Sequence, residues 1–452
     1  MELSHIQRVY LIGIGGIGMS GLARYFHKRG CIVCGYDRTE TALTSSLMAE
    51  GIAIVFNDDP NYIPFAFQEN DANTLIIYTP AVPKDSAILN YFRDRDFELK
   101  KRSEVLGIIS KGMFCIAVAG THGKTTTSSM VAHILKSSGN DCSAFLGGLA
   151  TNYNSNVLFG ANQVVVVEAD EYDRSFLTLH PDIAIVTSMD ADHLDIYGDA
   201  GHLTESFQLF ASQLKTGGQL IHRQGLALAG GTSYAVEQPA DACAKNVRIE
   251  NGNFVFDFVS DLIQIPNITL GLPGLHNVEN ALAAIEAALI LHIPADKIKT
   301  ALADFKGVKR RFEYILRSED QVYIDDYAHH PEELKACIKA VKTLYPNKKL
   351  TTVFQPHLYS RTRDFAPGFA EALSMSDELW MLDIYPAREL PIEGVNSDMI
   401  LNKMPSAMPK RLGTKQDILN WAKAESPELL LTVGAGDIDT LVLPLKNLLK
   451  ND

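Results

Sequence analysis

A short glycine-rich stretch in the first third of the chain carries the residues best suited to phosphate chemistry. An apolar run from Phe114 to Ala119, typical of a buried strand, leads into GTHGKTT at 120–126, and a helical pattern follows. Main-chain amides and a helix N-terminus attract phosphates, Lys124 can reach the outer phosphates of a nucleotide, and the Thr125 hydroxyl can ligate magnesium. The layout predicts a phosphate-binding loop, although Val118 stands where the generic pattern has glycine. The alternative is a glycine-rich turn with a surface lysine.

Two later apolar runs end in residues that could bind a metal ion. Val164–Val167 leads into Glu168, and Ile183–Thr187 leads towards His193. Continuous apolar runs suit parallel strands covered on both faces, and the carboxyl ends of such strands share one edge of the sheet. We therefore expect Glu168 and His193 to converge with the Thr125 hydroxyl on a magnesium ion. A surface acid or helix cap at Glu168 and a loop histidine at 193 are the alternatives.

The N-terminal segment carries a second glycine loop. A strand at Arg8–Ile12 is followed by GIGGIG at 13–18, a helix to about residue 29 and a strand that ends before Asp37. This βαβ pattern is a dinucleotide-type fingerprint, but such a loop can hold the diphosphate of any nucleotide, and Asp37 can bind a ribose-like hydroxyl. An NAD-dependent oxidoreductase is the alternative, and it leaves GTHGKTT unexplained.

Further polar clusters lie in the second half of the chain. Asn277 and Asn280, at the start of an alanine-rich helix, can pair with an adenine edge, and helix capping by Asn277 is compatible with this. The basic run 309–311 suits phosphate contact, with a solvated cluster as the alternative. Short β-like runs between 217 and 270 predict an added small sheet.

The last segment predicts another open α/β unit without a phosphate loop. Apolar runs at Val322–Asp326, Leu350–Phe354 and Leu429–Val433 alternate with helical patterns, and polar residues follow each run. Pro331 can start a helix after the first of these strands. This unit is therefore expected to bind a second substrate in a cleft.

Composition limits the class of protein. A chain of 452 residues predicts two to four domains, and a net charge of −13 argues against a nonspecific nucleic-acid binder. The six cysteines are scattered, and the Cys31–Cys34 pair is interpreted as buried reduced thiols. No secretory signal pattern and no apolar run of membrane-spanning length occurs in the sequence. We therefore expect a cytoplasmic protein without membrane insertion.

Taken in order, the motifs resemble those of the Mur ligase family over almost the whole chain. They are GIGGIG, AGTHGKTTT, EADEYD, DADHLD, GLHNVEN, RRFE, DDYAHHP, SRTRD and GAGDI. The family's loop resembles GTxGKTT, so Val118 fits it. The resemblance implies an α/β protein of three domains. These are a Rossmann-like UDP-sugar domain at 1–112, a central P-loop-type ATPase domain with a mostly parallel sheet at 113–313, and a C-terminal Rossmann-like domain at 314–452 for amino acid and nucleotide closure.

The resemblance also implies roles for individual residues. Catalytic roles fall on Lys124, at the γ-phosphate, Glu168 and His193, and magnesium is bound by Thr125, Glu168 and His193. The residues implied for ATP are Gly120, Thr121, His122, Gly123, Lys124, Thr125, Thr126, His276, Asn277, Asn280, Arg311 and Asp326. Those implied for the UDP-sugar are Gly15, Gly16, Ile17, Asp37, Thr79 and Arg102. His329, His357 and Arg361 are implied on the amino-acid side, where some members have arginine in place of Leu358.

The implied activity is ATP-dependent ligation through an acyl phosphate, with ATP and Mg2+ as cofactors. The stretch at 181–198 resembles members that join L-alanine to UDP-N-acetylmuramate in peptidoglycan precursor synthesis; members that add a preformed tripeptide are the alternative. A non-catalytic nucleotide-binding module is a third reading. His193 and His329 are candidates for the general base. Phe207 stands near the place where sister ligases carry a modified lysine, so no such modification is expected, and the protein is expected to be a monomer or dimer.

Overall fold

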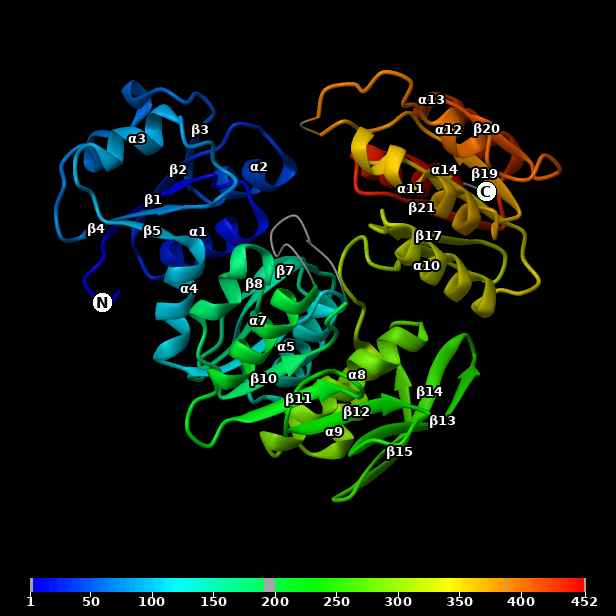
Figure 1. The fold of residues 1–452 in the computed structure, drawn as a ribbon, viewed down its shortest axis with the longest axis horizontal. Coiled ribbons are helices and arrows are strands. Elements are labelled where there is room, and N and C mark those ends of the chain that lie inside the picture. Colours follow the sequence, from blue (N-terminus) through cyan, green and yellow to red (C-terminus); the bar gives the residue numbers. More distant parts are fainter. Residues whose placement is uncertain (1–2, 191–199, 388, 451–452) are drawn as a thin grey trace. The chain divides into compact units, whose positions relative to one another are not determined.

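The computed structural model describes residues 3–190, 200–387 and 389–450, and these fall into two compact units. The first unit comprises Met1–Arg248, Val255–Gly271 and His276–Phe305. The second comprises Ile249–Phe254, Leu272–Leu275 and Lys306–Asp452. Strands and helices alternate in both units, which confirms the predicted α/β class (Figure 1).

The N-terminal part of the first unit is a five-stranded parallel sheet in the order β3-β2-β1-β4-β5. The strands are β1 (Arg8–Ile12), β2 (Ile32–Tyr36), β3 (Ala53–Val55), β4 (Thr74–Tyr78) and β5 (Leu99–Lys101). The helices are α1 (Ile17–Lys28), α2 (Ala42–Ala49), α3 (Ala87–Arg93) and α4 (Arg102–Lys111), with short 3-10 turns η1 (Pro60–Tyr62) and η2 (Phe65–Phe67). The glycine loop connects the central strand, β1, to α1.

A ten-stranded sheet follows, in the order β15-β14-β13-β12-β11-β10-β6-β9-β7-β8. Its strands are β6 (Phe114–Ala119), β7 (Ser143–Ala150), β8 (Ser155–Leu158), β9 (Val164–Glu168), β10 (Ile183–Val186), β11 (Gln219–Arg223), β12 (Thr232–Val236), β13 (Ala242–Glu250), β14 (Asn253–Ser260) and β15 (Gln264–Leu270). Its helices are α5 (Lys124–Ser138), η3 (Tyr172–Thr178), α7 (Ala200–Ser212), α8 (Leu275–Ile290) and α9 (Ala295–Asp304). The strands at 217–270 thus extend the central sheet, whereas the sequence predicted an added small sheet.

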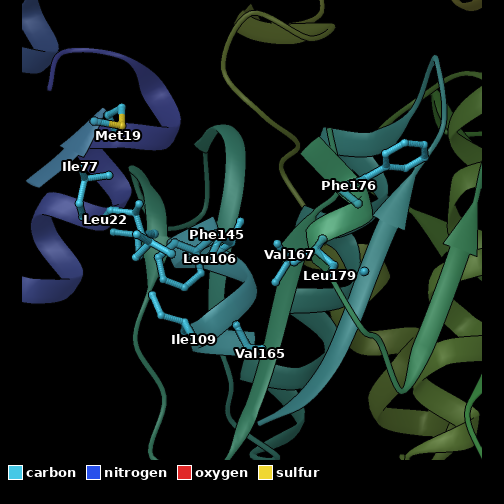
Figure 2. Close-up of a cluster of buried hydrophobic side chains, with 14 of the residues drawn as sticks. Met19, Leu22, Ile77, Leu106, Ile109, Phe145, Val165, Val167, Phe176 and Leu179 are labelled. Atoms are coloured by element: carbon cyan, nitrogen blue, oxygen red, sulfur yellow. The ribbon is translucent and has the colours of Figure 1, made fainter. Parts of the chain in front are cut away.

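The two sheets of the first unit share one hydrophobic core. Met19 and Leu22 of α1 belong to the same buried cluster as Phe145 of β7 and as Val165 and Val167 of β9 (Figure 2). Burial of apolar area in a common core stabilises α1, and with it the glycine loop, against the central sheet. The predicted domain limits at 112–113 and 313–314 fall between α4 and β6 and at the start of β16. They stay predictions.

The second unit has a six-stranded sheet in the order β16-β17-β21-β18-β19-β20, parallel except for the β16–β17 pair. The strands are β16 (Glu313–Arg317), β17 (Val322–Asp326), β18 (Leu350–Phe354), β19 (Glu378–Met381), β20 (Lys410–Leu412) and β21 (Leu429–Val433). The helices are α10 (Pro331–Leu344), α11 (Tyr359–Leu373), α12 (Asp398–Leu401), α13 (Lys415–Glu425), η4 (Asp437–Leu441) and α14 (Val442–Leu449). As predicted, α10 begins at Pro331.

Two predictions from composition can be compared with this fold. All six cysteines are buried and free, so Cys31 and Cys34 are buried thiols without a disulfide, as predicted for that pair. None of the helices in the described ranges combines the length and the apolar character that a membrane crossing needs.

Candidate active site

The predicted phosphate loop lies between β6 and α5, at the carboxyl end of the central sheet. Gly120 and Gly123 have φ angles of +137° and +81°, which L side chains rarely adopt. A Cβ at Gly120 would also stand 2.1 Å from Oγ1 of Thr187, and one at Gly123 would stand 2.6 Å from Oδ1 of Asn280. The loop therefore needs both glycines, for conformation and for close approach.

The end of β10 holds this loop in place. The amide of His122 donates to Oγ of Ser188 at 2.7 Å, and the amide of Thr121 donates to the Ser188 carbonyl at 3.2 Å. The Thr187 hydroxyl donates to the Ala119 carbonyl at 3.1 Å. These contacts fix the loop before any phosphate arrives. The sequence reasoning missed the role of Ser188, because no sequence pattern marks a hydroxyl that supports a loop from a neighbouring strand.

The ammonium group of Lys124 lies over the loop. Its Nζ donates to the Gly120 carbonyl at 2.6 Å and to Oε1 of Glu171 at 2.8 Å, and Oε2 of Glu171 lies 2.7 Å away. The Glu171 side chain is 1% exposed. Burial raises its pKa, and the charge of Lys124 opposes that shift. Glu171 was not among the predicted site residues, although it lies inside the EADEYD motif.

Two of the three predicted magnesium ligands meet beside Lys124. The Thr125 hydroxyl donates to Oε1 of Glu168 at 3.1 Å, and the Gly147 amide donates to Oε2 of the same carboxylate at 2.8 Å. A hydroxyl and a carboxylate are oxygen donors of the kind that Mg2+ prefers, so both residues fit such an ion. The third, His193, lies outside the described residues. Within the described ranges, no group of three or more His, Cys, Asp or Glu side chains forms a metal cluster.

The start of α8 lies beside the phosphate loop, as Gly123 and Asn280 show. The Nδ2 of Asn280 donates to Oδ1 of Asn277 at 3.3 Å, and both side chains are buried. His276 is exposed at the first turn of this helix. The two asparagines predicted for adenine are therefore close to the loop predicted for phosphates, in the same unit.

The residues predicted for the UDP-sugar gather around the N-terminal glycine loop. The Gly15 amide donates to Oδ2 of Asp37 at 2.7 Å, so this carboxylate supports the loop itself. A Cβ at Gly13 would stand 2.7 Å from Cγ2 of Thr79, and one at Gly18 would stand 2.4 Å from Nη1 of Arg102. Thus Thr79 and Arg102 both border the loop that runs through Gly15, Gly16 and Ile17. Nη2 of Arg102 also lies 3.6 Å from Oδ2 of Asp170, which is two residues after Glu168 in the sequence.

The residues predicted for the amino-acid side cluster in the second unit. The rings of His329 and His357 have centroids 6.1 Å apart, and the His357 ring stacks on Tyr385 at 5.9 Å. Among the described residues, Nη1 of Arg361 is buried without a hydrogen-bond partner. Burial lowers the pKa of His329, against the opposing charge of Glu333. A guanidinium group with an unused donor is suited to bind a carboxylate.

Arg311 and Asp326, both predicted for the nucleotide, also lie in the second unit. The Asp326 carboxylate accepts hydrogen bonds from the amides of Phe312 and Ala328, at 2.6 and 2.7 Å. Burial raises its pKa to about 6. Arg311 is exposed next to this segment, and its charge acts on Asp326.

Three family models match the chain in succession. They are the Mur ligase family catalytic domain at residues 8–113, the Mur ligase middle domain at 118–288, and the Mur ligase glutamate ligase domain at 310–436. A UDP-N-acetylmuramate–L-alanine ligase of Flavobacterium johnsoniae is 51% identical over all of both chains.

Solved structures show the same similarity. The UDP-N-acetylmuramate-alanine ligase of Thermotoga maritima has a TM-score of 0.83 at 27% identity, covering 97% of this chain and 98% of that one. A murein peptide ligase from Psychrobacter arcticus has a TM-score of 0.68 at 22% identity, with 99% of each chain covered, which is a likeness of fold. The three-sheet α/β architecture, the phosphate loop with its glutamates and the match over the full length agree: the chain belongs to the Mur ligase family.

Proposed function

We propose that this chain is an ATP-dependent ligase that joins L-alanine to the lactyl carboxylate of UDP-N-acetylmuramate, in peptidoglycan precursor synthesis. The observation that carries this proposal is the 51% identity, over the whole of both chains, to a relative named for that reaction. The geometry agrees with it, because the phosphate loop and the N-terminal glycine loop belong to one compact unit with a common core. We also infer that the protein works in the cytoplasm as a monomer or dimer.

The proposed reaction proceeds in two steps. The lactyl carboxylate attacks the γ-phosphate of ATP, ADP leaves, and an acyl phosphate remains. The L-alanine amine then attacks the acyl carbonyl, and inorganic phosphate leaves. Lys124 stabilises the negative charge on the transferring phosphoryl group, and the main-chain amides of the loop hold the other phosphates.

Magnesium fits beside this loop. Thr125 and Glu168 would hold the ion together with His193, and the bound ion would neutralise charge on the nucleotide phosphates. Each oxygen of the Glu168 carboxylate accepts a hydrogen bond, one from the Thr125 hydroxyl and one from the Gly147 amide, and these bonds fix its orientation. Such fixed orientation of a ligand is typical of metal sites.

The amine must lose a proton before it attacks. Of the two candidate bases, His329 belongs to the described residues, and burial lowers its pKa, which favours the neutral ring that a base needs. Its Nδ1 lies 2.9 Å from the Tyr327 carbonyl, which favours a proton on Nδ1 and leaves Nε2 as the acceptor. This geometry supports His329 as the base.

The test measures ADP and phosphate release with ATP, Mg2+ and UDP-N-acetylmuramate. We expect release that depends on L-alanine and yields UDP-N-acetylmuramoyl-L-alanine. Release that requires the tripeptide L-alanyl-γ-D-glutamyl-meso-diaminopimelate instead would support the muropeptide-adding alternative. No amino-acid-dependent release of ADP with either substrate would contradict the proposal.

A further inference from the structure

We propose that Glu171 is a positioning residue for the reaction, which holds the Lys124 ammonium over the phosphate loop. The inference rests on the proposed function. Both carboxylate oxygens of Glu171 lie within hydrogen-bonding distance of Nζ, at 2.8 and 2.7 Å. The Glu171 side chain is 1% exposed and that of Lys124 is 15% exposed, so water screens this ion pair weakly.

The backbone around Glu171 is fixed on both sides. Before it, the Ala169 amide donates to the Val118 carbonyl of β6 at 2.9 Å. After it, the Arg174 amide donates to the Glu171 carbonyl at 2.9 Å, which ties the residue into the turn of η3. Because Val118 immediately precedes Ala119 and the phosphate loop, the carboxylate has a defined position relative to that loop.

One short segment therefore orients two neighbouring side chains of the phosphate loop. Glu168 accepts from the hydroxyl of Thr125, and Glu171, three residues later, binds the ammonium of Lys124. Strand β9, which lies next to β6, carries this segment. Because Glu168 and Glu171 belong to the same segment, the orientation of Lys124 depends on the same backbone as the Glu168 carboxylate, which would hold the metal.

The ammonium group can keep Glu171 and still bind a phosphate. A lysine ammonium has three N–H donors on a flexible four-carbon stem. The Gly120 carbonyl accepts one donor at 2.6 Å, Glu171 accepts a second at 2.8 Å, and the Thr121 carbonyl accepts a third in a longer bond of 3.4 Å. Glu171 thus selects one conformation of a flexible side chain, and a phosphate oxygen can replace the Thr121 carbonyl in the longest of the three hydrogen bonds.

The main test compares Glu171→Gln with the wild type. We expect kcat to fall at least about tenfold and AMP-PNP to bind about tenfold more weakly, because the charged partner of the ammonium is lost. The dissociation constants of adenosine and of UDP-N-acetylmuramate should stay within about twofold, since the role proposed for Lys124 is at the phosphates of ATP. Unchanged kcat and unchanged AMP-PNP affinity would overturn the inference.

A double-mutant cycle with Lys124→Met separates positioning from a general structural role. If Glu171 acts through Lys124, adding Glu171→Gln to Lys124→Met should leave AMP-PNP affinity unchanged. An equal loss in both backgrounds would contradict the inference. The cycle needs binding only, so it remains decisive if the wild-type protein fails to ligate L-alanine, which would contradict the proposed function alone.

Two further variants test whether the effects of Glu171→Gln come from misfolding or from the loss of any ion pair. Glu171→Asp keeps the negative charge on a shorter side chain. Its kcat should therefore be higher than that of Glu171→Gln, and its affinity for AMP-PNP should be higher than that of Glu171→Gln. Asp182→Asn is a matched control, because Asp182 pairs with Lys215 at 2.8 Å just before β10, away from the loop at the other end of that strand. It should leave kcat and AMP-PNP affinity unchanged; a loss as large as that of Glu171→Gln would overturn the inference.

Discussion

The amide of Gly147 donates a 2.8 Å hydrogen bond to Oε2 of Glu168, and no side chain larger than hydrogen fits between them. A Cβ at Gly147 would stand 2.3 Å from both carboxylate oxygens. An edge hairpin, β7–β8, therefore fixes the orientation of the carboxylate proposed to hold magnesium. This contact depends on the close approach of the β7 main chain to the Glu168 carboxylate, and it needs no positively charged side chain.

We predict that Gly147→Ala displaces Glu168 and weakens magnesium binding. The Mg2+ concentration for half-maximal ADP release should rise at least about tenfold, as expected when the support of a metal ligand is lost. The affinity for UDP-N-acetylmuramate should not change. Gly112→Ala is the control, because a Cβ at this exposed glycine meets no atom of the described residues within 4 Å. An unchanged Mg2+ dependence in Gly147→Ala would contradict the role given to this contact.

Lys124→Ala is predicted to abolish ligation without loss of sugar-nucleotide binding. The substitution removes the ammonium group that would stabilise the transferring phosphoryl group, and loss of such a group costs about a hundredfold or more in kcat. The glycine loop at 13–18 does not depend on this side chain, so calorimetry should give a normal dissociation constant for UDP-N-acetylmuramate. Near-normal turnover would refute the proposed mechanism.

A substitution in the N-terminal glycine loop should weaken sugar-nucleotide binding and leave ATP binding unchanged, which is the opposite of the effect of Lys124→Ala. A Cβ at Gly15 would stand 2.8 Å from Oδ2 of Asp37, the atom that accepts the Gly15 amide hydrogen bond. Gly15→Ala should therefore distort the loop and raise the KM for UDP-N-acetylmuramate strongly, while AMP-PNP affinity stays normal. An equal loss of AMP-PNP affinity would show that the glycine loop at 13–18 and the phosphate loop at 120–126 are not independent binding sites.

Much of this fold could be predicted because buried parallel strands leave a plain pattern. Strands β1, β6 and β17 have the predicted bounds, since each is a largely apolar run that stops at a glycine loop or at polar residues. Strand β7 and the edge strand β8 were missed. Their sequences, SAFLGGLA and SNVL, contain glycines and polar residues, and Gly147 is required by contact with Glu168 rather than by a turn.

The candidate site was predicted where a motif carries the chemistry and missed where tertiary contacts do. Lys124, Thr125 and Glu168 follow from loop and strand patterns, and the structure brings them together. The pairing of Glu171 with Lys124 depends on the path of η3 after β9, which no local pattern specifies. Likewise, the continuation of the central sheet through β11 and β12 depends on pairing between distant segments.

Asn156 joins the edge hairpin to the helix that follows the glycine loop. Its Nδ2 donates to the Ile17 carbonyl at 2.5 Å and to Oγ of Ser20 at 3.1 Å, and its Oδ1 accepts from Arg24 at 2.8 Å. The side chain is 1% exposed. Asn156→Ala should destabilise the protein by about 2 kcal/mol, because it removes the three hydrogen bonds of a buried side chain.

The measurement is thermal unfolding followed by circular dichroism, with UDP-N-acetylmuramate binding in parallel. The exposed Asn162 provides the matched control, and Asn162→Ala should leave the unfolding temperature nearly unchanged. Because Asn156 contacts the first turns of α1, its replacement should also weaken sugar-nucleotide binding. Equal unfolding temperatures for the two variants would contradict the structural role of Asn156.

Asp325 gives the second unit a pH-dependent stability. Its side chain is fully buried on β17, where Oδ2 lies 3.2 Å from Nε of Arg310 and Oδ1 accepts from the Thr432 hydroxyl at 2.5 Å. Burial raises the pKa of Asp325 from 3.8 to about 7, although Arg310 opposes the shift. A carboxyl group whose pKa is higher in the folded state stabilises the fold at low pH, and this stabilisation is lost as pH rises through about 7.

Asp325→Asn should remove this pH dependence, since an amide does not titrate. Between pH 5 and pH 8, the wild type should lose about 2–3 kcal/mol more stability than the variant, as follows from the shifted pKa. The variant also loses its ion pair with Arg310, so the comparison uses the change with pH rather than the stability at one pH. Urea unfolding at both pH values measures it, with Asp320→Asn, an exposed carboxylate in the same unit, as the control. Asp320→Asn should follow the wild type, and an equal change with pH in Asp325→Asn would mean that Asp325 is ionised throughout this range.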